Sequence, residues 1–315
     1  MLISRETLDD VLLELYPKLL EQSGTVVATR GEMAEVIGAL IQITKPRARL
    51  SRSETRSKIF SSLGELLWYL TRDNRLDFIE GYLSQYREES EDTVTVYGGY
   101  GPRLFNQRGH NQIQNVIDLL KVRSTSRRAV IQLFNAEDIA DKHNEIPCTT
   151  TLQFLARNRH LDLVVTMRSN DAYIGLPHDV FCFTMLQEII ARTLGLEVGH
   201  YRHFVGSLHL YKKNWKSAQQ FVDEGYQTRI EMPEMPAGDP WPSLDQVLRT
   251  EARIRTGDKV DANTLGLADY WSDLVKLLQI HFSAIDLERT ALLDNMSFRR
   301  YRPYVLGRLE SSRES

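Results

Sequence analysis

The most apolar long segment of the chain, VFCFTMLQEIIARTL over residues 180–194, constrains the fold most. Its apolar residues recur without a proline or glycine, which predicts a long buried helix. Residues 161–168 before it and 203–211 after it are short and rich in β-branched and apolar side chains, which predicts strands. A buried helix between strands favours an α+β fold.

The rest of the chain supports that fold class. Apolar residues three and four apart predict helices over 8–22, 57–71, 113–122, 242–252 and 267–282, and shorter ones over 77–85. Further strands are expected over 36–43, 129–134 and 150–156, and a solvated loop over the acidic run up to residue 92. Pro-rich turns after residue 225 mark a subdomain edge. We expect one domain, with a core of about 25–225 and a mostly helical extension over 226–315.

Composition narrows the class of protein. A chain of 315 residues with 42% hydrophobic content is long enough to bury a sizeable core. A net charge of -3 gives no overall attraction to nucleic acid, and two cysteines are too few for a disulfide framework. The N-terminus lacks the apolar core of a signal peptide, and no apolar run approaches the roughly 18–20 residues of a membrane span. We expect a cytoplasmic protein without a membrane or nucleic-acid partner.

Cys148 is the first candidate for chemistry. It follows Pro147 and directly precedes a predicted strand, a position that holds a side chain rigidly. A lone cysteine is otherwise a small buried hydrophobe, and that alternative stays open at this point. About twenty residues later, TMRSNDAYIGLPHDVFCF gathers a cation, a hydroxyl, an amide and carboxylates between a strand and a helix, which is typical of a binding site.

Several spaced blocks, in order, resemble the thymidylate synthase family over roughly residues 25–215, and such a series is far more specific than any single motif. The blocks are Gly64-Glu65-Leu66-Leu67-Trp68, Val96-Tyr97-Gly98, Ser126-Arg127-Arg128, Pro147-Cys148, Gln153-Phe154, Arg168-Ser169-Asn170-Asp171, Gly175-Leu176-Pro177, Gly206 and His209-Leu210-Tyr211. The resemblance implies a mixed, largely antiparallel sheet with surrounding helices, one face of which forms a homodimer.

The resemblance also implies the nucleophile and the nucleotide site. Cys148 would add to C6 of a pyrimidine, making C5 nucleophilic, and its thiol needs a nearby positive charge, for which Arg168 is the natural source. Arginine forks suit a phosphate. Phosphate contacts are therefore implied for Arg168 and Ser169, for Arg127 and Arg128 from the partner subunit, and for Arg30, whose block is less similar. Nucleotide contacts are also implied for Asn170, and contacts with the ribose 3′-hydroxyl for His209 and Tyr211.

Acid–base and folate roles follow from the same resemblance. Glu65 lies in an apolar helix, so its pKa should be raised, which suits proton transfer through water. Tyr97 resembles a tyrosine of that proton network. Asp171 and Trp68 are assigned to the folate site, which implies 5,10-methylenetetrahydrofolate as the one-carbon donor and no metal.

Two departures from the family pattern suggest a different substrate and product. Asp179 replaces the asparagine that recognises uracil; a carboxylate accepts from a cytosine amino group but donates to uracil O4 only when protonated. This change marks the deoxycytidylate hydroxymethylase branch, although a structural role for Asp179 is the alternative. No tryptophan lies between Trp68 and Tyr97, where Tyr86 stands near the expected place. A more polar pocket would let water capture the one-carbon unit, giving hydroxymethyl instead of methyl.

Other departures leave the network around the base open. Thr149 follows the nucleophile where a histidine is usual, Ser207 replaces an aspartate, and the C-terminus lacks a hydrophobic ending. The first hypothesis is a catalytic (d)CMP 5-hydroxymethylase acting through Cys148, Glu65, Asp179 and Tyr97. The second is a divergent thymidylate synthase or a dUMP hydroxymethylase. The third is a non-catalytic nucleotide- or RNA-binding relative.

Overall fold

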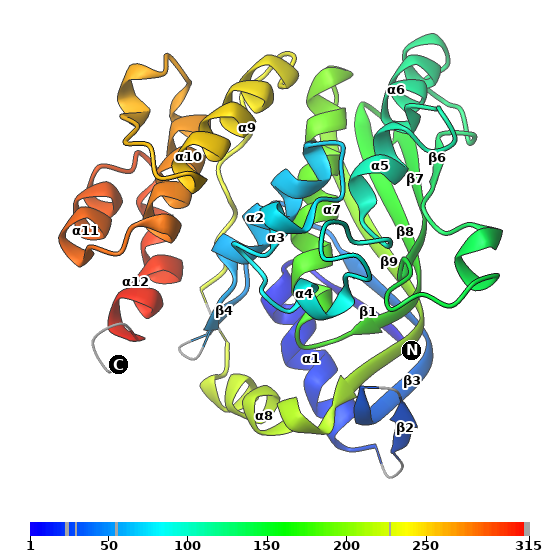
Figure 1. Cartoon of the computed structure of the whole chain (residues 1–315). Helices are drawn as coiled ribbons and strands as arrows, with labels where there is room; N and C mark the ends of the chain where they lie inside the picture. Colours follow the sequence, from blue (N-terminus) through cyan, green and yellow to red (C-terminus); the bar gives the residue numbers. More distant parts are fainter. Residues whose placement is uncertain (23–24, 29, 54–55, 227, 312–315) are drawn as a thin grey trace.

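The computed structural model describes residues 1–22, 25–28, 30–53, 56–226 and 228–311 (Figure 1). Its strands are β1 (Leu2–Arg5), β2 (Val26–Ala28), β3 (Gly31–Ile43), β4 (Arg52–Ser53), β5 (Arg56–Ser57), β6 (Val130–Gln132), β7 (Thr149–Arg157), β8 (His160–Asp171) and β9 (Glu197–Tyr211). Its helices are α1 (Leu8–Leu20), α2 (Ile59–Leu70), α3 (Leu76–Ile79), α4 (Tyr86–Glu89), α5 (Tyr100–Phe105), α6 (Gln112–Val122), α7 (Gly175–Thr193), α8 (Trp215–Glu224), α9 (Trp241–Arg255), α10 (Asp269–Phe282), α11 (Asp286–Asp294) and α12 (Arg302–Ser311).

The main sheet has the order β1-β3-β9-β8-β7-β6, with β2 added to β3. Neighbours pair antiparallel except for β1 with β3 and β8 with β9. The parallel pair of β8 and β9 is long, and its register sets Ser169 opposite Ser207 and Asp171 opposite His209. The sheet is therefore mixed and largely antiparallel, which confirms the expected α+β class.

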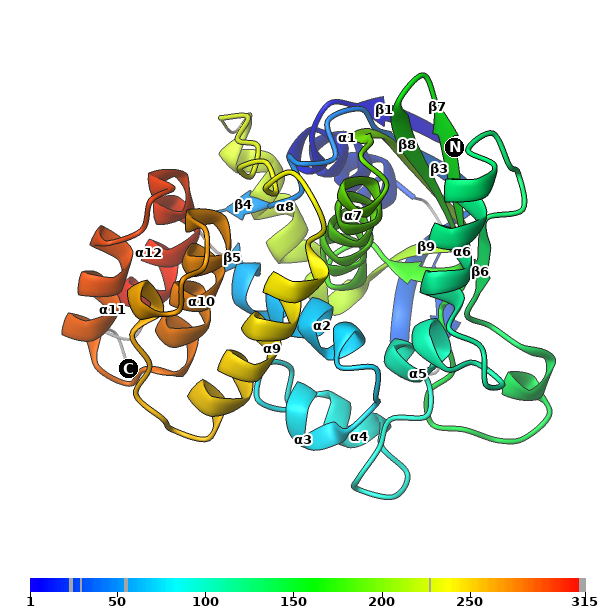
Figure 2. The same cartoon turned by 90° about the horizontal axis from the view of Figure 1, so that it is seen from above.

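One face of the sheet is covered by helices. Figure 2 shows α1 and α7 on the same side of the strands, with α2 beyond α7. Residues alternate between the two faces of a strand. Val205 of β9 is accordingly fully buried, whereas its neighbour Phe204 faces the other side and is 42% exposed. The predicted buried helix is α7, and all but its ends are buried.

The C-terminal helices α9–α12 form a group beside α2 (Figure 1). Buried polar contacts join the chain after residue 225 to the sheet-containing part. The guanidinium of Arg49 forms a fully buried ion pair with Glu188 of α7, whose second oxygen accepts the Met235 backbone N–H at 3.0 Å. The hydroxyl of Tyr82 donates to Glu251 of α9 at 2.9 Å. Among the helices in the described part of the chain, none combines the length and apolar character that a membrane crossing requires.

The polar segment expected as a loop between strand and helix is mostly regular structure. Strand β8 continues to Asp171 and α7 begins at Gly175. The turn between them is held by the Asp171 carboxylate, which accepts the backbone N–H groups of Tyr173 at 2.8 Å and Ile174 at 3.3 Å. The acidic run before residue 92 also differs from expectation, because α4 buries most of the Glu89 side chain.

Candidate active site

The cysteine lies where β7 begins, beside β8. The backbone N–H of Arg168 donates to the Cys148 carbonyl at 2.8 Å, which registers the two strands at this point. The Arg168 side chain turns back along the same loop and donates from Nε to the Pro147 carbonyl and from Nη2 to the Ile146 carbonyl, each at 3.0 Å. Arg168 thus fixes the backbone that carries the thiol, while its guanidinium remains exposed enough to meet an anion.

The electrostatic surroundings of the thiol are mixed. Burial, with smaller contributions from the carboxylates of Glu145 and Asp179, raises the pKa of Cys148 to about 12, even though Arg168 and Arg30 lower it. The positive charge of Arg168 acts in the expected direction, but desolvation is the larger effect. Cys148 is therefore a thiol in the ligand-free protein, and it needs a proton acceptor or a bound substrate to become a nucleophile.

Glu65 lies on α2 and is almost completely buried. Its Oε1 accepts the hydroxyls of Tyr69 at 2.7 Å and Tyr86 at 3.1 Å. Burial raises the pKa of Glu65, and the two hydroxyl donors oppose that rise. This agrees with the raised pKa expected from the sequence, and a carboxyl whose pKa is moved toward neutrality suits proton transfer.

Asp179 is buried near the start of α7, and it is the last member of a series of hydrogen-bonded buried polar groups. Its Oδ2 accepts from the Asn170 amide at 2.7 Å, and the Asn170 carbonyl oxygen contacts His203 Nε2 at 3.0 Å. His203 Nδ1 lies 2.7 Å from the Tyr201 hydroxyl. Burial lowers the pKa of His203 to about 3. The imidazole is therefore neutral, with Nε2–H donating to Asn170 and Nδ1 accepting from Tyr201.

The hydrogen bonds from Tyr201 through His203 fix the orientation of the Asn170 amide, so that its NH₂ group faces Asp179. Gly175 provides the space: a Cβ at this position would lie 2.8 Å from Asn170 Nδ2. Burial and the charge of Glu65 raise the pKa of Asp179 well above its usual range, while the Asn170 donor lowers it. Asp179 is thus a buried acid with one oxygen already occupied by a donor.

Arg30 is held in an ion-paired cluster at the same site. Its Nη2 lies 2.8 Å from Glu145 Oε2 and 3.0 Å from Glu89 Oε1, and the guanidinium is half exposed. Burial and the neighbouring Glu145 raise the pKa of Glu89 to about 7, even though Arg30 lowers it. Arg30 is therefore close enough to Cys148 to affect the thiol, but in the ligand-free protein it is occupied by carboxylates.

The other predicted nucleotide ligands lie on β8 and β9, except for two arginines that lie between α6 and β6. The register of β8 and β9 brings Ser169, His209 and Tyr211 to the same end of the sheet. His209 and Tyr211 lie ring edge to face at 4.9 Å, and burial lowers the pKa of His209. In contrast, Arg127 and Arg128 are exposed and lie between α6 and β6. Their contact with a nucleotide in a partner subunit stays a prediction.

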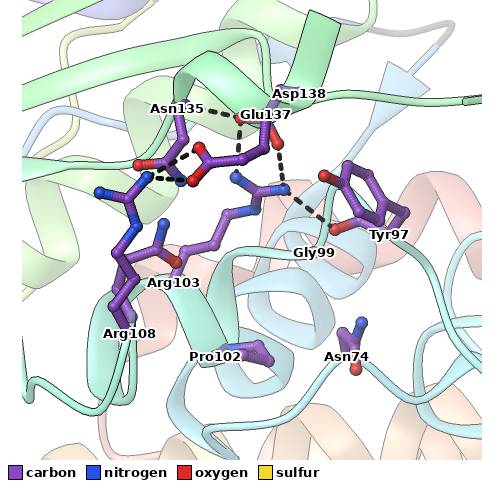
Figure 3. A pocket seen from close by; sticks show the side chains of 10 residues that line it. Asn74, Tyr97, Gly99, Pro102, Arg103, Arg108, Asn135, Glu137 and Asp138 are labelled. Carbon is purple, nitrogen blue, oxygen red and sulfur yellow. Dashed lines mark hydrogen bonds and ion pairs between the residues drawn. The ribbon is translucent and has the colours of Figure 1, made fainter. Parts of the chain in front are cut away.

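Tyr97 has other contacts than the resemblance implies. Tyr97 stacks on the His143 ring at 3.6 Å and forms a hydrogen bond with Asp138. Its side chain lines a pocket of about 300 Å³ together with Arg103 and Asp138 (Figure 3). Neither Cys148 nor Glu65 is among the residues that line this pocket. The tyrosine hydroxyls that donate hydrogen bonds to Glu65 belong instead to Tyr69 and Tyr86.

Trp68 is 1% exposed and donates its indole N–H to the Arg75 carbonyl at 3.0 Å, with the Tyr86 ring 5.2 Å away. It therefore supports Tyr86, and a direct folate contact stays a prediction. Asp171 is the other residue predicted for the folate site, and this role also stays a prediction. Its carboxylate is half-buried and anchored through Oδ1, and a carboxylate is the acceptor that the amino and N–H donors of a pterin require.

Several residues of the site were missing from the sequence-based prediction. Glu145 and Glu89 were not singled out, because acidic residues in polar segments usually face solvent. Tyr69 was hidden among the apolar residues of α2, although its spacing of four from Glu65 puts the two side chains on one helix face. His203 appeared only as a strand residue, because its link to Asn170 depends on the parallel pairing of β8 with β9.

The fold is a mixed sheet with helices on one face, and the site places a thiol at a strand end near two buried acids on α2 and α7. The family model described as Thymidylate synthase matches residues 42–247, more than half of the chain. The chain therefore belongs to the thymidylate synthase family. Enzymes of this family use 5,10-methylenetetrahydrofolate as the one-carbon donor.

Relatives with named activities fall into two groups. A deoxyuridylate hydroxymethyltransferase of Bacillus phage SP01 is 28% identical over 250 residues, covering 73% of this chain and 65% of the relative. One of Delftia phage PhiW-14 is 29% identical over 184 residues, covering 54% and 51%. A thymidylate synthase of Buchnera aphidicola is 32% identical over 170 residues, covering 52% and 64%. The chain thus spans about half to two thirds of the length of these relatives.

Proposed function

We propose that this protein transfers a one-carbon unit to C5 of a pyrimidine nucleoside monophosphate, and more specifically that it is a cytidylate 5-hydroxymethylase. The reaction is (d)CMP plus 5,10-methylenetetrahydrofolate and water to 5-hydroxymethyl-(d)CMP and tetrahydrofolate. The family supports the general reaction, and relatives named hydroxymethyltransferases support the product. The choice of cytosine depends on Asp179.

The observation that carries this choice is the contact of Asp179 with Asn170. The amide donates to Oδ2 at 2.7 Å, so the carboxyl group is fixed in its plane; the base would be met by Oδ1 and by the second lone pair of Oδ2. A carboxyl group accepts from the cytosine N4 amino group, and a proton held between it and N3 makes the pairing bidentate. That shared proton would also withdraw electrons from the ring and favour addition at C6. The raised pKa of Asp179 supports such a shared proton.

The steps assign one task to each side chain. Cys148 adds through Sγ to C6, and the electrons of the C5–C6 double bond make C5 nucleophilic. The folate, when bound, supplies a methylene group at the oxidation level of formaldehyde. Glu65 relays the C5 proton through water, and elimination of Cys148 restores the aromatic ring. Arg168 and Ser169 hold the phosphate, assisted by Arg30.

The hydroxyl of Tyr86 supports water as the final nucleophile. It donates to Glu65 at 3.1 Å, in the region where synthases carry a tryptophan. A hydroxyl there keeps a polar path to Glu65, whereas an indole would shield the one-carbon unit. His209 and Tyr211 suit the ribose 3′-hydroxyl, and we favour dCMP over CMP because the ribose residues keep the synthase pattern.

A homodimer completes the proposed site. Arg127 and Arg128 are exposed, and in this proposal they reach the phosphate in the partner subunit. The face of the sheet opposite α1 and α7 carries Phe204, which is 42% exposed, and β3 exposes Ile37 to 72%. An apolar sheet face of this kind supports packing against a second copy.

A dUMP hydroxymethylase is the second candidate. The phage relatives carry that activity in their names, and one structural feature is compatible with it. A protonated Asp179 could donate to uracil O4 while its other oxygen accepts from N3–H, so the raised pKa of this acid serves either base.

The test is to incubate the protein with methylenetetrahydrofolate and each of dCMP, CMP and dUMP, and to measure the products by mass spectrometry. A gain of CH₂O on a cytidylate is expected. Hydroxymethyl-dUMP would favour the second candidate, and thymidylate from dUMP would contradict both. Retained nucleotide binding without any turnover would indicate a non-catalytic relative.

A further inference from the structure

A carboxylate outside the family blocks lies against the cysteine. Glu145 precedes Cys148 by three residues, and its Oε1 is the acceptor for the Cys148 Sγ–H at 3.9 Å. Its other oxygen, Oε2, is ion-paired with Arg30 at 2.8 Å. The Glu145 side chain is only 21% exposed, so its position is determined by packing as well as by these two partners.

The other acids near the thiol are engaged elsewhere. Glu65 Oε1 accepts from two tyrosine hydroxyls, and Asp179 Oδ2 accepts from Asn170. Within the described part of the chain, Glu145 is the carboxylate for which a hydrogen bond with Sγ is found. The thiol also experiences the charges of Arg168 and Arg30, both of which stabilise a thiolate.

Arg30 keeps Glu145 able to accept a proton. Burial raises the pKa of Glu145, and both Arg30 and Arg168 lower it, so the guanidinium partners oppose neutralisation of the buried carboxyl. Arg30 is shared with Glu89, which is 13% exposed. A phosphate dianion competes strongly for a guanidinium, and any shift of Arg30 toward it would make Glu145 more basic.

We propose that Glu145 is the general base for Cys148, a role that rests on the proposed covalent reaction at C6. As the Sγ–C6 bond forms, the Sγ–H bond breaks and its proton moves to Glu145 Oε1, while the C5–C6 electron pair moves toward C5 and C4. On elimination, the Sγ–C6 bond breaks and Glu145 returns the proton to sulfur. Arg168 stabilises the negative charge that develops on sulfur as the Sγ–C6 bond forms and again as it breaks.

Two measurements on Glu145→Gln test this proposal, and they should change in opposite directions. Without nucleotide, loss of the negative charge should lower the pKa of the thiol, so alkylation of Cys148 by iodoacetamide at pH 8 should become about three- to tenfold faster. With dCMP or CMP and no folate, exchange of the C5 hydrogen with solvent should become about a hundredfold slower, because the base is missing. Glu145→Asp should recover part of the exchange.

The matched control is Glu137→Gln, which removes an exposed carboxylate paired with Arg108 and should change neither rate. Unchanged C5 exchange in Glu145→Gln would overturn the proposal. A parallel fall of alkylation and exchange would also overturn it, because that result indicates a positioning role. If the wild-type protein exchanges no nucleotide, the proposed function fails first; the alkylation rates then show separately whether Glu145 is the partner of the thiol.

Discussion

At the scale of single residues, the two buried acids of the site are distinguished by their donors. Glu65 accepts from two tyrosine hydroxyls, which are themselves weak acids and suit a proton relay. Asp179 accepts from Asn170, an amide that cannot transfer a proton but fixes the carboxyl plane. In the proposed reaction, the first setting suits proton transfer and the second suits recognition of a base.

Asp179→Asn should move base preference toward uracil. The Asn170 amide donates toward position 179, so it should hold the new carbonyl oxygen on its own side and leave the new NH₂ group facing the base. That NH₂ group donates to uracil O4 but meets the cytosine amino group donor to donor, so preference should change by about tenfold or more. Competition between dCMP and dUMP, followed by mass spectrometry, measures the ratio. Asp141→Asn, at an exposed position, is the control. An unchanged ratio would remove Asp179 from base recognition.

Tyr86→Phe should change the pH dependence of turnover. The Tyr86 hydroxyl lowers the pKa of Glu65, so its loss should raise that pKa, and the acidic limb of the kcat/KM profile should move to higher pH. Tyr226→Phe, whose side chain is 87% exposed, is the control. A limb that stays in place, or that moves to lower pH, would separate Tyr86 from the relay through Glu65.

At the scale of elements, the short turn between β8 and α7 determines the site. Extension of β8 to Asp171 and the start of α7 at Gly175 bring Asn170 and Asp179 into contact across only one turn. The sequence predicted both the strand and the helix, but not this junction. Polar residues weaken the periodic pattern, so Arg168 through Asp179 had the composition of a loop, although tertiary contacts extend regular structure into it.

Much of the candidate site could nevertheless be predicted from local sequence. Cys148, Glu65 and Arg168 stand in blocks that resemble the family. The resting state of the thiol could not be predicted, because it depends on burial and on Glu145 and Asp179, whose closeness follows from the fold. The contact between Asn170 and His203 likewise requires knowledge that β8 pairs with β9 in parallel.

The buried pair of Arg49 and Glu188 joins the segment before β4 to α7, and Glu188 also holds the segment that leads into α9 through the Met235 N–H, so disruption of the pair should be costly. Arg49→Met leaves a buried carboxylate without its cation, which should reduce the free energy of unfolding by about 3–5 kcal/mol. Urea unfolding at a fixed protein concentration measures this change. Arg253→Met breaks an exposed pair with Asp258 and should cost about 1 kcal/mol or less. Equal losses in both variants would contradict the structural role of the buried pair.

At the scale of the whole molecule, the proposed phosphate site needs residues from a second copy of the chain. Arg168 and Arg30 lie beside Cys148, whereas Arg127 and Arg128 are exposed between α6 and β6. The sheet face that carries Phe204 is the surface through which a second copy could supply them. The helical group α9–α12 lies beside α2, and the expected division into a core and a C-terminal extension stays a prediction.

Mixed dimers should show whether the two arginines act in trans. Neither Cys148→Ser alone nor the Arg127→Gln, Arg128→Gln double variant alone should turn over nucleotide efficiently. Mixing them under conditions that allow subunit exchange should restore activity, because in a mixed dimer one site has both an intact cysteine and intact partner arginines. Steady-state turnover against the mixing ratio measures this effect. The absence of any gain, with mixed dimers confirmed by native mass spectrometry, would place the arginines outside the partner's site.

The central claim is that Cys148 activates a cytosine ring by adding to C6, and that water completes the hydroxymethylation at C5. An equimolar mixture of dCMP and dUMP, incubated with methylenetetrahydrofolate in water enriched in oxygen-18, tests it most directly by mass spectrometry. We predict 5-hydroxymethyl-dCMP with oxygen-18 in its new hydroxyl, and none from Cys148→Ser. Products from dUMP alone, or a methylated product without the heavy oxygen, would contradict this account.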